Sequence, residues 1–102
     1  MDTEMPLPEW ARTLEQRDPG FVDAYLAMRL RILKDGAIPA KYKLLMGMVM
    51  DAVAAHPDGV AGLAASARAA ADSEGEITEA VEVGYLWGGT AALVMGAKAF
   101  TT

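Results

Sequence analysis

His56 is the only histidine of the chain, so it is the side chain best suited to exchange protons near neutral pH. It stands at the end of an apolar segment and directly before Pro57-Asp58-Gly59, a sequence typical of a turn. In that place it could act as a general base. The simpler interpretation is a capping or surface histidine in a turn, and the residue types alone favour it.

Asp51 is the only charged residue between Leu44 and Ala55. A buried carboxylate needs a partner or a raised pKa, so Asp51 could orient His56 and complete a catalytic pair. Five residues of continuous helix turn through about 140°, so the two side chains share a face only if the helix breaks. The alternative, which this spacing favours, is an ion pair between Asp51 and a Lys or Arg of another helix or subunit.

Lys41 and Lys43 flank Tyr42 just after Pro39. We predict Lys43 and Tyr42 as substrate-binding residues, because a basic pair could attract an acidic substrate. The alternative is a solvated helix face, with the lysine stems lying along the surface.

Trp87, two residues after Tyr85, could line a substrate pocket and is the third predicted binding residue. Aromatic residues in a glycine-rich segment also serve as packing groups. The methionines at 46, 48 and 50 fit a core better than a ligand site.

Several kinds of chemistry are excluded by composition. The chain has no cysteine, which removes thiolate nucleophiles, disulfides and Cys-ligated metals. A single histidine argues against a transition-metal site, and no phosphate loop or dinucleotide motif occurs, so we predict no metal and no cofactor.

The charge balance limits the partners. A net charge of −5 and scattered Lys and Arg argue against nucleic acid and anionic membranes. The longest uncharged stretch, Val83 to Ala97, is too short to span a bilayer. Met1 to Glu9 is acidic and contains proline, unlike a signal peptide, so we expect a cytoplasmic protein.

The periodicity predicts a single all-α domain over residues 1–102, with about five helices. Apolar residues make up 53% of the chain, and alanine, the strongest helix former, supplies much of that share. Asp18-Pro19 and the Ser73/Glu76 pair are helix starts. The predicted helices cover residues 8–17, 19–34, 39 to 55 or 56, 60–72 and 76–100.

Two of these helices point to a partner subunit. The helix after Pro39 is apolar on nearly every face, which in so small a domain predicts burial against a second chain. In the last helix, small residues recur every four positions and would form a bare strip. The strip fits either a tight crossing within the chain or a subunit contact, and it consists of Gly84, Gly88, Ala92 and Gly96.

Two segments carry a resemblance to a known family, "IPAKYKLLMGMVMDAVAAHPDGV" and "EITEAVEVGYLWGGTAALVMGAKAF", with an Ala/Arg helix between them. In this order they resemble the carboxymuconolactone decarboxylase / alkylhydroperoxidase D family. The resemblance covers a core of about residues 38–100, with lead helices over 8–36. It implies a compact helical fold and a homo-oligomer, a trimer or hexamer.

The functional residues of that family do not recur here. In the hydroperoxidase type, the resemblance places the two cysteines of a Cys-x-x-Cys at His56 and Gly59, the histidine at Leu63, and the upstream glutamate at Leu44 or Lys43. Without a cysteine, the thiol–disulfide cycle of that branch cannot run. The decarboxylase branch uses a histidine at the position of Leu63, so its catalytic residue is missing too.

We therefore expect a cysteine-free relative that is not a thiol peroxidase. If it is catalytic, it should use cofactor-free acid–base chemistry of the decarboxylase (lyase) type on a small organic acid, with His56 and Asp51 as the catalytic residues. The alternative is a non-catalytic oligomeric scaffold or small-ligand-binding protein. A pocket with convergent polar groups around His56 would favour the enzyme, and a fully solvated His56 over a filled core would favour the scaffold.

Overall fold

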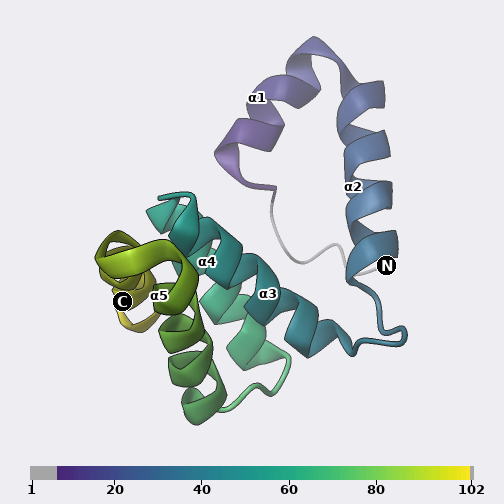
Figure 1. The fold of residues 1–102 in the computed structure, drawn as a ribbon. Helices are drawn as coiled ribbons and strands as arrows, with labels where there is room; N and C mark the ends of the chain where they lie inside the picture. Colours follow the sequence, from purple (N-terminus) through teal and green to yellow (C-terminus); the bar gives the residue numbers. More distant parts are fainter. Residues whose placement is uncertain (1–6, 102) are drawn as a thin grey trace. The chain divides into compact units, whose positions relative to one another are not determined.

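The computed structural model describes residues 7–101, and all of its regular elements are helices (Figure 1). The all-α prediction is therefore confirmed. The sequence-based reading of residues 1–6, as part of an acidic segment unlike a signal peptide, lies outside the described residues. No helix of the described part is long and apolar enough to cross a membrane.

The chain forms two compact units, and each is described by itself. The lead unit ends at Lys34 and the core unit begins at Asp35. The sequence predicted one domain over the whole chain, and that remains a prediction.

The lead unit is a pair of helices, α1 (Glu9–Arg17) and α2 (Pro19–Leu33), which pack on each other. The predicted start of α2 is confirmed, because the Asp18 side chain caps it by accepting a hydrogen bond from the Phe21 N–H at 3.2 Å. Ala11 and Val22 are buried between the helices, and Trp10 meets Tyr25 edge to face at 5.5 Å.

The core unit contains α3 (Ala40–Val53), α4 (Pro57–Ala69), α5 (Glu74–Gly96) and a 3-10 helix, η1 (Ala97–Phe100). α3 packs against both α4 and α5, and η1 returns to lie against α4. The residues at the centre of this packing are almost all aliphatic, and they include Met48, Ala52, Val60, Ala64, Ile77 and Val81.

Two helices end earlier than predicted, and for the same reason. Ala55 and Ala71 adopt left-handed backbone angles, with φ of 64° and 76°, and terminate α3 and α4. In each case the next N–H bonds back to the helix: His56 to the Asp51 carbonyl at 2.8 Å, and Asp72 to the Ala67 carbonyl at 2.9 Å. These are Schellman ends, which usually carry a glycine where this chain has alanine.

α4 and α5 also begin earlier than expected. α4 starts at Pro57, which takes the first helical position, so Pro57-Asp58-Gly59 forms the first turn of the helix and not a separate turn before it. α5 starts at Glu74 after the predicted Ser73/Glu76 capping box, which is present in both directions.

α5 is not the straight helix that the sequence predicted. Gly89 has φ 73° and ψ −168°, so the helix kinks there and its last part folds back (Figure 1). The folded-back segment brings Gly96 against Val81, where an added Cβ would come within 2.6 Å of the valine Cγ1. The φ and ψ angles of Gly89 are open to glycine and strained for any other residue.

The small-residue strip packs within the chain. A Cβ at Gly84 would lie 3.2 Å from Val49 of α3, and one at Gly88 would lie 3.0 Å from Val53. Gly84, Ala92 and Gly96 are buried. Of the two alternatives for the strip, the structure shows the crossing within the chain, in which α5 packs closely against α3.

α3 is only partly covered by this packing. The side chains of Met46, Met50 and Val53 are 46%, 64% and 50% exposed, although the apolar sequence predicted burial on nearly all faces. This face is where the prediction of a partner subunit now rests.

The kink at Gly89 yields a stability prediction. Gly89→Ala should cost about 1–3 kcal/mol, because alanine is strained at these backbone angles. Gly62→Ala is the matched control: Gly62 is an exposed interior residue of α4, and an added Cβ meets nothing within 4 Å. It should gain about 0.5–1 kcal/mol from helix propensity. Urea denaturation followed by circular dichroism measures both, and equal stabilities for the two variants would contradict the kink.

Candidate functional site

Asp51 and His56 form a hydrogen-bonded pair at the junction of α3 and α4. His56 Nδ1 lies 3.1 Å from Asp51 Oδ1, and the two side chains are 64% and 27% exposed, respectively. A carboxylate can only accept, so Nδ1 must carry the proton, which leaves Nε2 of the neutral ring as the basic nitrogen. This is the orientation that a general-base histidine needs.

The helix end is what brings the pair together. A continuous helix would hold Asp51 and His56 about 140° apart. The left-handed Ala55 reverses the chain, so that the His56 N–H bonds the Asp51 carbonyl and its ring comes to lie beside the Asp51 carboxylate. The condition that the sequence set for this pair, a break in the helix, is met.

Gly59 makes room for the Asp51 carboxylate. A Cβ built at Gly59 would overlap Asp51 Oδ2 and would lie 2.7 Å from Asp51 Cγ. Gly59 is in the first turn of α4, where backbone N–H groups lack helical partners and a negative charge is stabilised. The carboxylate therefore occupies the volume that a side chain at position 59 would fill.

The three predicted binding residues do not all lie with this pair. Lys43 is eight residues before Asp51 on α3, about 12 Å along the helix axis. Tyr42 is farther still; its hydroxyl hydrogen-bonds Glu76, and the Lys41 Nζ lies 5.0 Å from its ring centroid. Lys43 and Tyr42 thus belong to the opposite end of α3.

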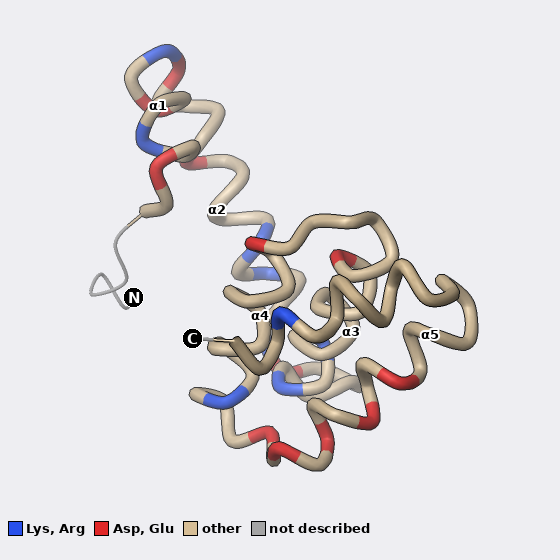
Figure 2. The backbone as a smooth tube through the Cα atoms, turned by 90° about the vertical axis from the view of Figure 1, so that its left-hand side faces the viewer, with Lys and Arg blue, Asp and Glu red and all other residues tan. Residues whose placement is uncertain are grey.

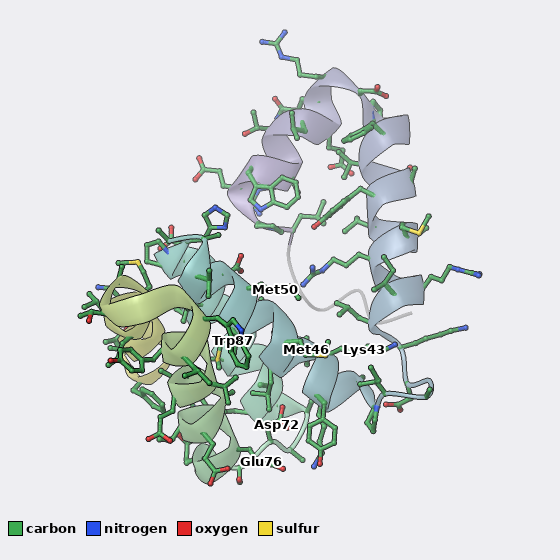
Figure 3. The ribbon with its side chains drawn as sticks, in the orientation of Figure 1. Lys43, Met46, Met50, Asp72, Glu76 and Trp87 are labelled. Carbon is green, nitrogen blue, oxygen red and sulfur yellow. The ribbon has the colours of Figure 1, made fainter. Side chains whose placement is uncertain are left out.

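Trp87 lies at the same end of α3 as the pair. It precedes Gly88, which packs on Val53, and its side chain is 78% exposed (Figure 3). The part of α5 that carries Trp87 therefore approaches the end of α3 near Asp51, whereas Lys43 and Tyr42 lie at the other end.

A separate groove of about 310 Å³ runs between α3 and α5. We call it the α3–α5 groove, and its lining is wholly apolar: Leu45, Met46, Val49, Met50, Ala80 and Val83. It includes neither Asp51 nor His56, so it does not surround the pair with polar groups. Among the described residues, no group of three His, Asp or Glu side chains is placed to hold a metal ion.

Asp72 is a charged residue that sequence reasoning missed. It is 6% exposed, and neither carboxylate oxygen has a hydrogen-bond partner among residues 7–101. Burial raises its pKa, the negative charge of Glu76 adds to that shift, and Lys41 opposes it. Its position, between the Schellman end of α4 and the Ser73 cap of α5, is usually apolar. The boundary was visible in the sequence, but the inward direction of this side chain was not.

Gly59→Ala should separate the Asp51–His56 pair. The new methyl group displaces the carboxylate, so the Nδ1-protonated ring loses its acceptor. Two-bond ¹H–¹⁵N spectra of the neutral imidazole should show Nδ1–H in the native chain and a shift towards the Nε2–H tautomer in the variant. Gly62→Ala on the same helix is the control and should leave the spectrum as in the native chain. A native ring protonated mainly at Nε2 would contradict the pair.

Asp72 predicts a pH dependence of stability. Its pKa in the folded state lies above the ordinary value of 3.8, so the folded chain binds the proton more tightly than the unfolded chain. The resulting stabilisation is complete below the ordinary pKa and is lost as the pH rises through the folded one. Asp72→Asn removes this dependence. The free energy of unfolding of the variant, relative to that of the native chain, should therefore rise from about pH 4 towards neutrality. Urea denaturation across that range measures the difference, and a difference that stays flat would exclude the buried carboxylate.

Comparisons with known proteins agree with this fold. The model of the "Carboxymuconolactone decarboxylase family" matches residues 19–102. A crystal structure of the "putative carboxymuconolactone decarboxylase" of Burkholderia xenovorans LB400 is similar, with 34% sequence identity and a TM-score of 0.85; the match covers 91% of this chain and 74% of that one. No match was found among curated proteins. A family model that spans most of the chain, together with a solved structure of the same fold at this identity, shows that the chain belongs to the carboxymuconolactone decarboxylase family.

Proposed function

We propose that this family member is a cofactor-free lyase of the decarboxylase type that acts on a small organic acid, with Asp51 and His56 as its acid–base pair. The observation that carries the proposal is the 3.1 Å contact between His56 Nδ1 and Asp51 Oδ1. It leaves Nε2 on an exposed ring, where it can exchange a proton with a substrate. With no cysteine in the chain, thiol peroxidase chemistry is excluded.

The pair can supply the proton step of a decarboxylation. The bond between the substrate carbon and its carboxylate breaks, CO₂ leaves, and the electron pair stays on the carbon, delocalised into a neighbouring carbonyl. Nε2 of His56 first takes up a proton from solvent, and the resulting imidazolium, which Asp51 stabilises, delivers that proton to the carbon. The N-terminus of α4, which directly follows His56, favours a negatively charged substrate group nearby. Trp87 is the proposed substrate contact, and Lys43 and Tyr42 are left out of the site.

The proposal includes self-association. Exposed apolar side chains on α3 and α5 support it, among them Met50 at 64%, Leu86 at 72% and Trp87 at 78%. Surfaces of this kind mark interaction sites when they are contiguous. The family resemblance implies a trimer or hexamer, and an assembly could also enclose the exposed pair.

A second candidate function, a non-catalytic scaffold or small-ligand binder, is favoured by one observation. The His56 side chain is 64% exposed, and the α3–α5 groove, which could take an apolar ligand, does not include it. The two functions differ in whether changes at the pair affect turnover.

His56→Ala should abolish most activity if the chain is an enzyme. A general base contributes roughly 10²–10⁴-fold, so kcat/KM should fall by that factor, with a smaller loss for Asp51→Asn, which keeps the ring but weakens its orientation. The assay follows CO₂ release from carboxymuconolactone and related lactone acids. Asp58→Asn, an exposed acid in the first turn of α4, is the control and should retain activity.

Two results would contradict the lyase assignment. One is turnover that is indifferent to His56→Ala in a folded variant. The other is an absence of turnover across lactone acids by a native chain that still binds them in calorimetry, which would favour the ligand-binding alternative.

A further inference from the structure

The core unit leaves an apolar surface open along the α3–α5 groove. Met46 and Met50 are about half or more exposed on one side of it, and Val83 is 52% exposed on the other. None of the lining side chains is polar, so none can orient a small polar ligand. An apolar surface lined by side chains of two helices is suited to a helix that presents an apolar stripe.

α2 presents such a stripe. The residues of the stripe are four, three and four positions apart, so their side chains lie on one face of the helix. Val22, on another face, is buried in the contact with α1, and of the stripe residues Tyr25 also meets Trp10 of α1. The stripe consists of Phe21, Tyr25, Met28 and Ile32, exposed by 61%, 36%, 56% and 57%.

Charges flank both surfaces with opposite signs. Arg29 and Arg31 lie on either side of the α2 stripe, each roughly 80° from its centre by the helical repeat. Acidic positions run along α5 (Figure 2), and Glu76 and Glu79 lie within one helical turn of Ala80 and Val83, the α5 residues that line the groove. Because the arginines flank the stripe on both sides, one of them meets the acidic rim whichever way the helix lies.

We propose that the α3–α5 groove of one copy of this chain receives the α2 stripe of a second copy. This inference rests on the self-association in the proposed function and names its surface. Each copy carries one groove and one stripe, matched in apolar character and, along the α5 rim, complementary in charge. A ring of copies in which each groove receives the stripe of the next therefore satisfies every groove and every stripe, and it closes the assembly with the symmetry of a trimer.

The absence of cysteine makes this contact testable by disulfide trapping. Met28→Cys, on the stripe, and Met50→Cys, in the groove, are placed on separate chains that carry different tags and are expressed together. Mild oxidation should give a covalent heterodimer with one chain of each kind. The control pairs Met28→Cys with Ala65→Cys, an exposed position on α4 outside the groove, and should give at least tenfold less product.

A double variant, Met28→Cys with Met50→Cys in one chain, tests the rival occupant. If α2 entered the groove of its own chain, oxidation would give a disulfide-closed single chain and no heterodimer, which would overturn the inference. Exchange between copies should instead give covalent oligomers.

Light scattering of the native chain separates this inference from the self-association itself. A monomer at all concentrations would overturn both. An assembly that yields no Met28–Met50 product would overturn the inference alone. Charge reversal of Arg29 and Arg31 to Glu should weaken the native assembly by about tenfold or more, and Glu79→Arg should restore part of that loss. Arg17→Glu on α1 is the matched control, and an equal effect from it would count against the α2 contact.

Discussion

The close approach of α3 to its two neighbours is the constraint on which the core unit depends. The helices come close at points where a side chain of one helix packs against a glycine of the other. Leu63 of α4 enters the space at Gly47, where a Cβ would lie 3.1 Å from its Cδ1. Val49 and Val53 of α3 fill the spaces at Gly84 and Gly88 of α5. Each glycine costs helix stability of about 0.5–1 kcal/mol relative to alanine, so the packing must offset that cost.

The candidate site and the groove both follow from this packing. Asp51 uses the same device: its carboxylate lies where a side chain at position 59 would stand, at the start of α4 and beside His56. The face of α3 that carries Met46 and Met50 remains open, because α4 and α5 occupy its other faces. One helix thus holds the proposed acid–base pair at its end and the proposed docking surface along its length. A member of this family without cysteine has room for an acid–base pair at the helix junction, where the family resemblance places thiols.

Local chemistry made much of the fold predictable. Asp18 with Pro19, and Ser73 with Glu76, started α2 and α5 as expected, because capping depends on residues close in sequence. The predicted ends of α3 and α4 were too late in the chain, because the left-handed residues are Ala55 and Ala71 rather than glycine, and alanine does not indicate a reversal. The pairing of Asp51 with His56 depends on that same reversal, and the kink at Gly89 and the burial of Asp72 depend on tertiary packing. Lys43 and Tyr42 were grouped with the site by residue type, whereas the length of α3 separates them from it.

A double-mutant cycle between Gly84 and Val49 tests this packing most directly. Gly84→Leu should destabilise the chain by about 1–3 kcal/mol, because the new side chain needs the volume that Val49 occupies. Val49→Ala frees that volume, so the double variant should be more stable than the sum of the two single changes predicts, by about 0.5–3 kcal/mol in urea denaturation. Two changes that simply add, to within about 0.5 kcal/mol, would show that α3 does not pack into the space at Gly84 and would contradict the account.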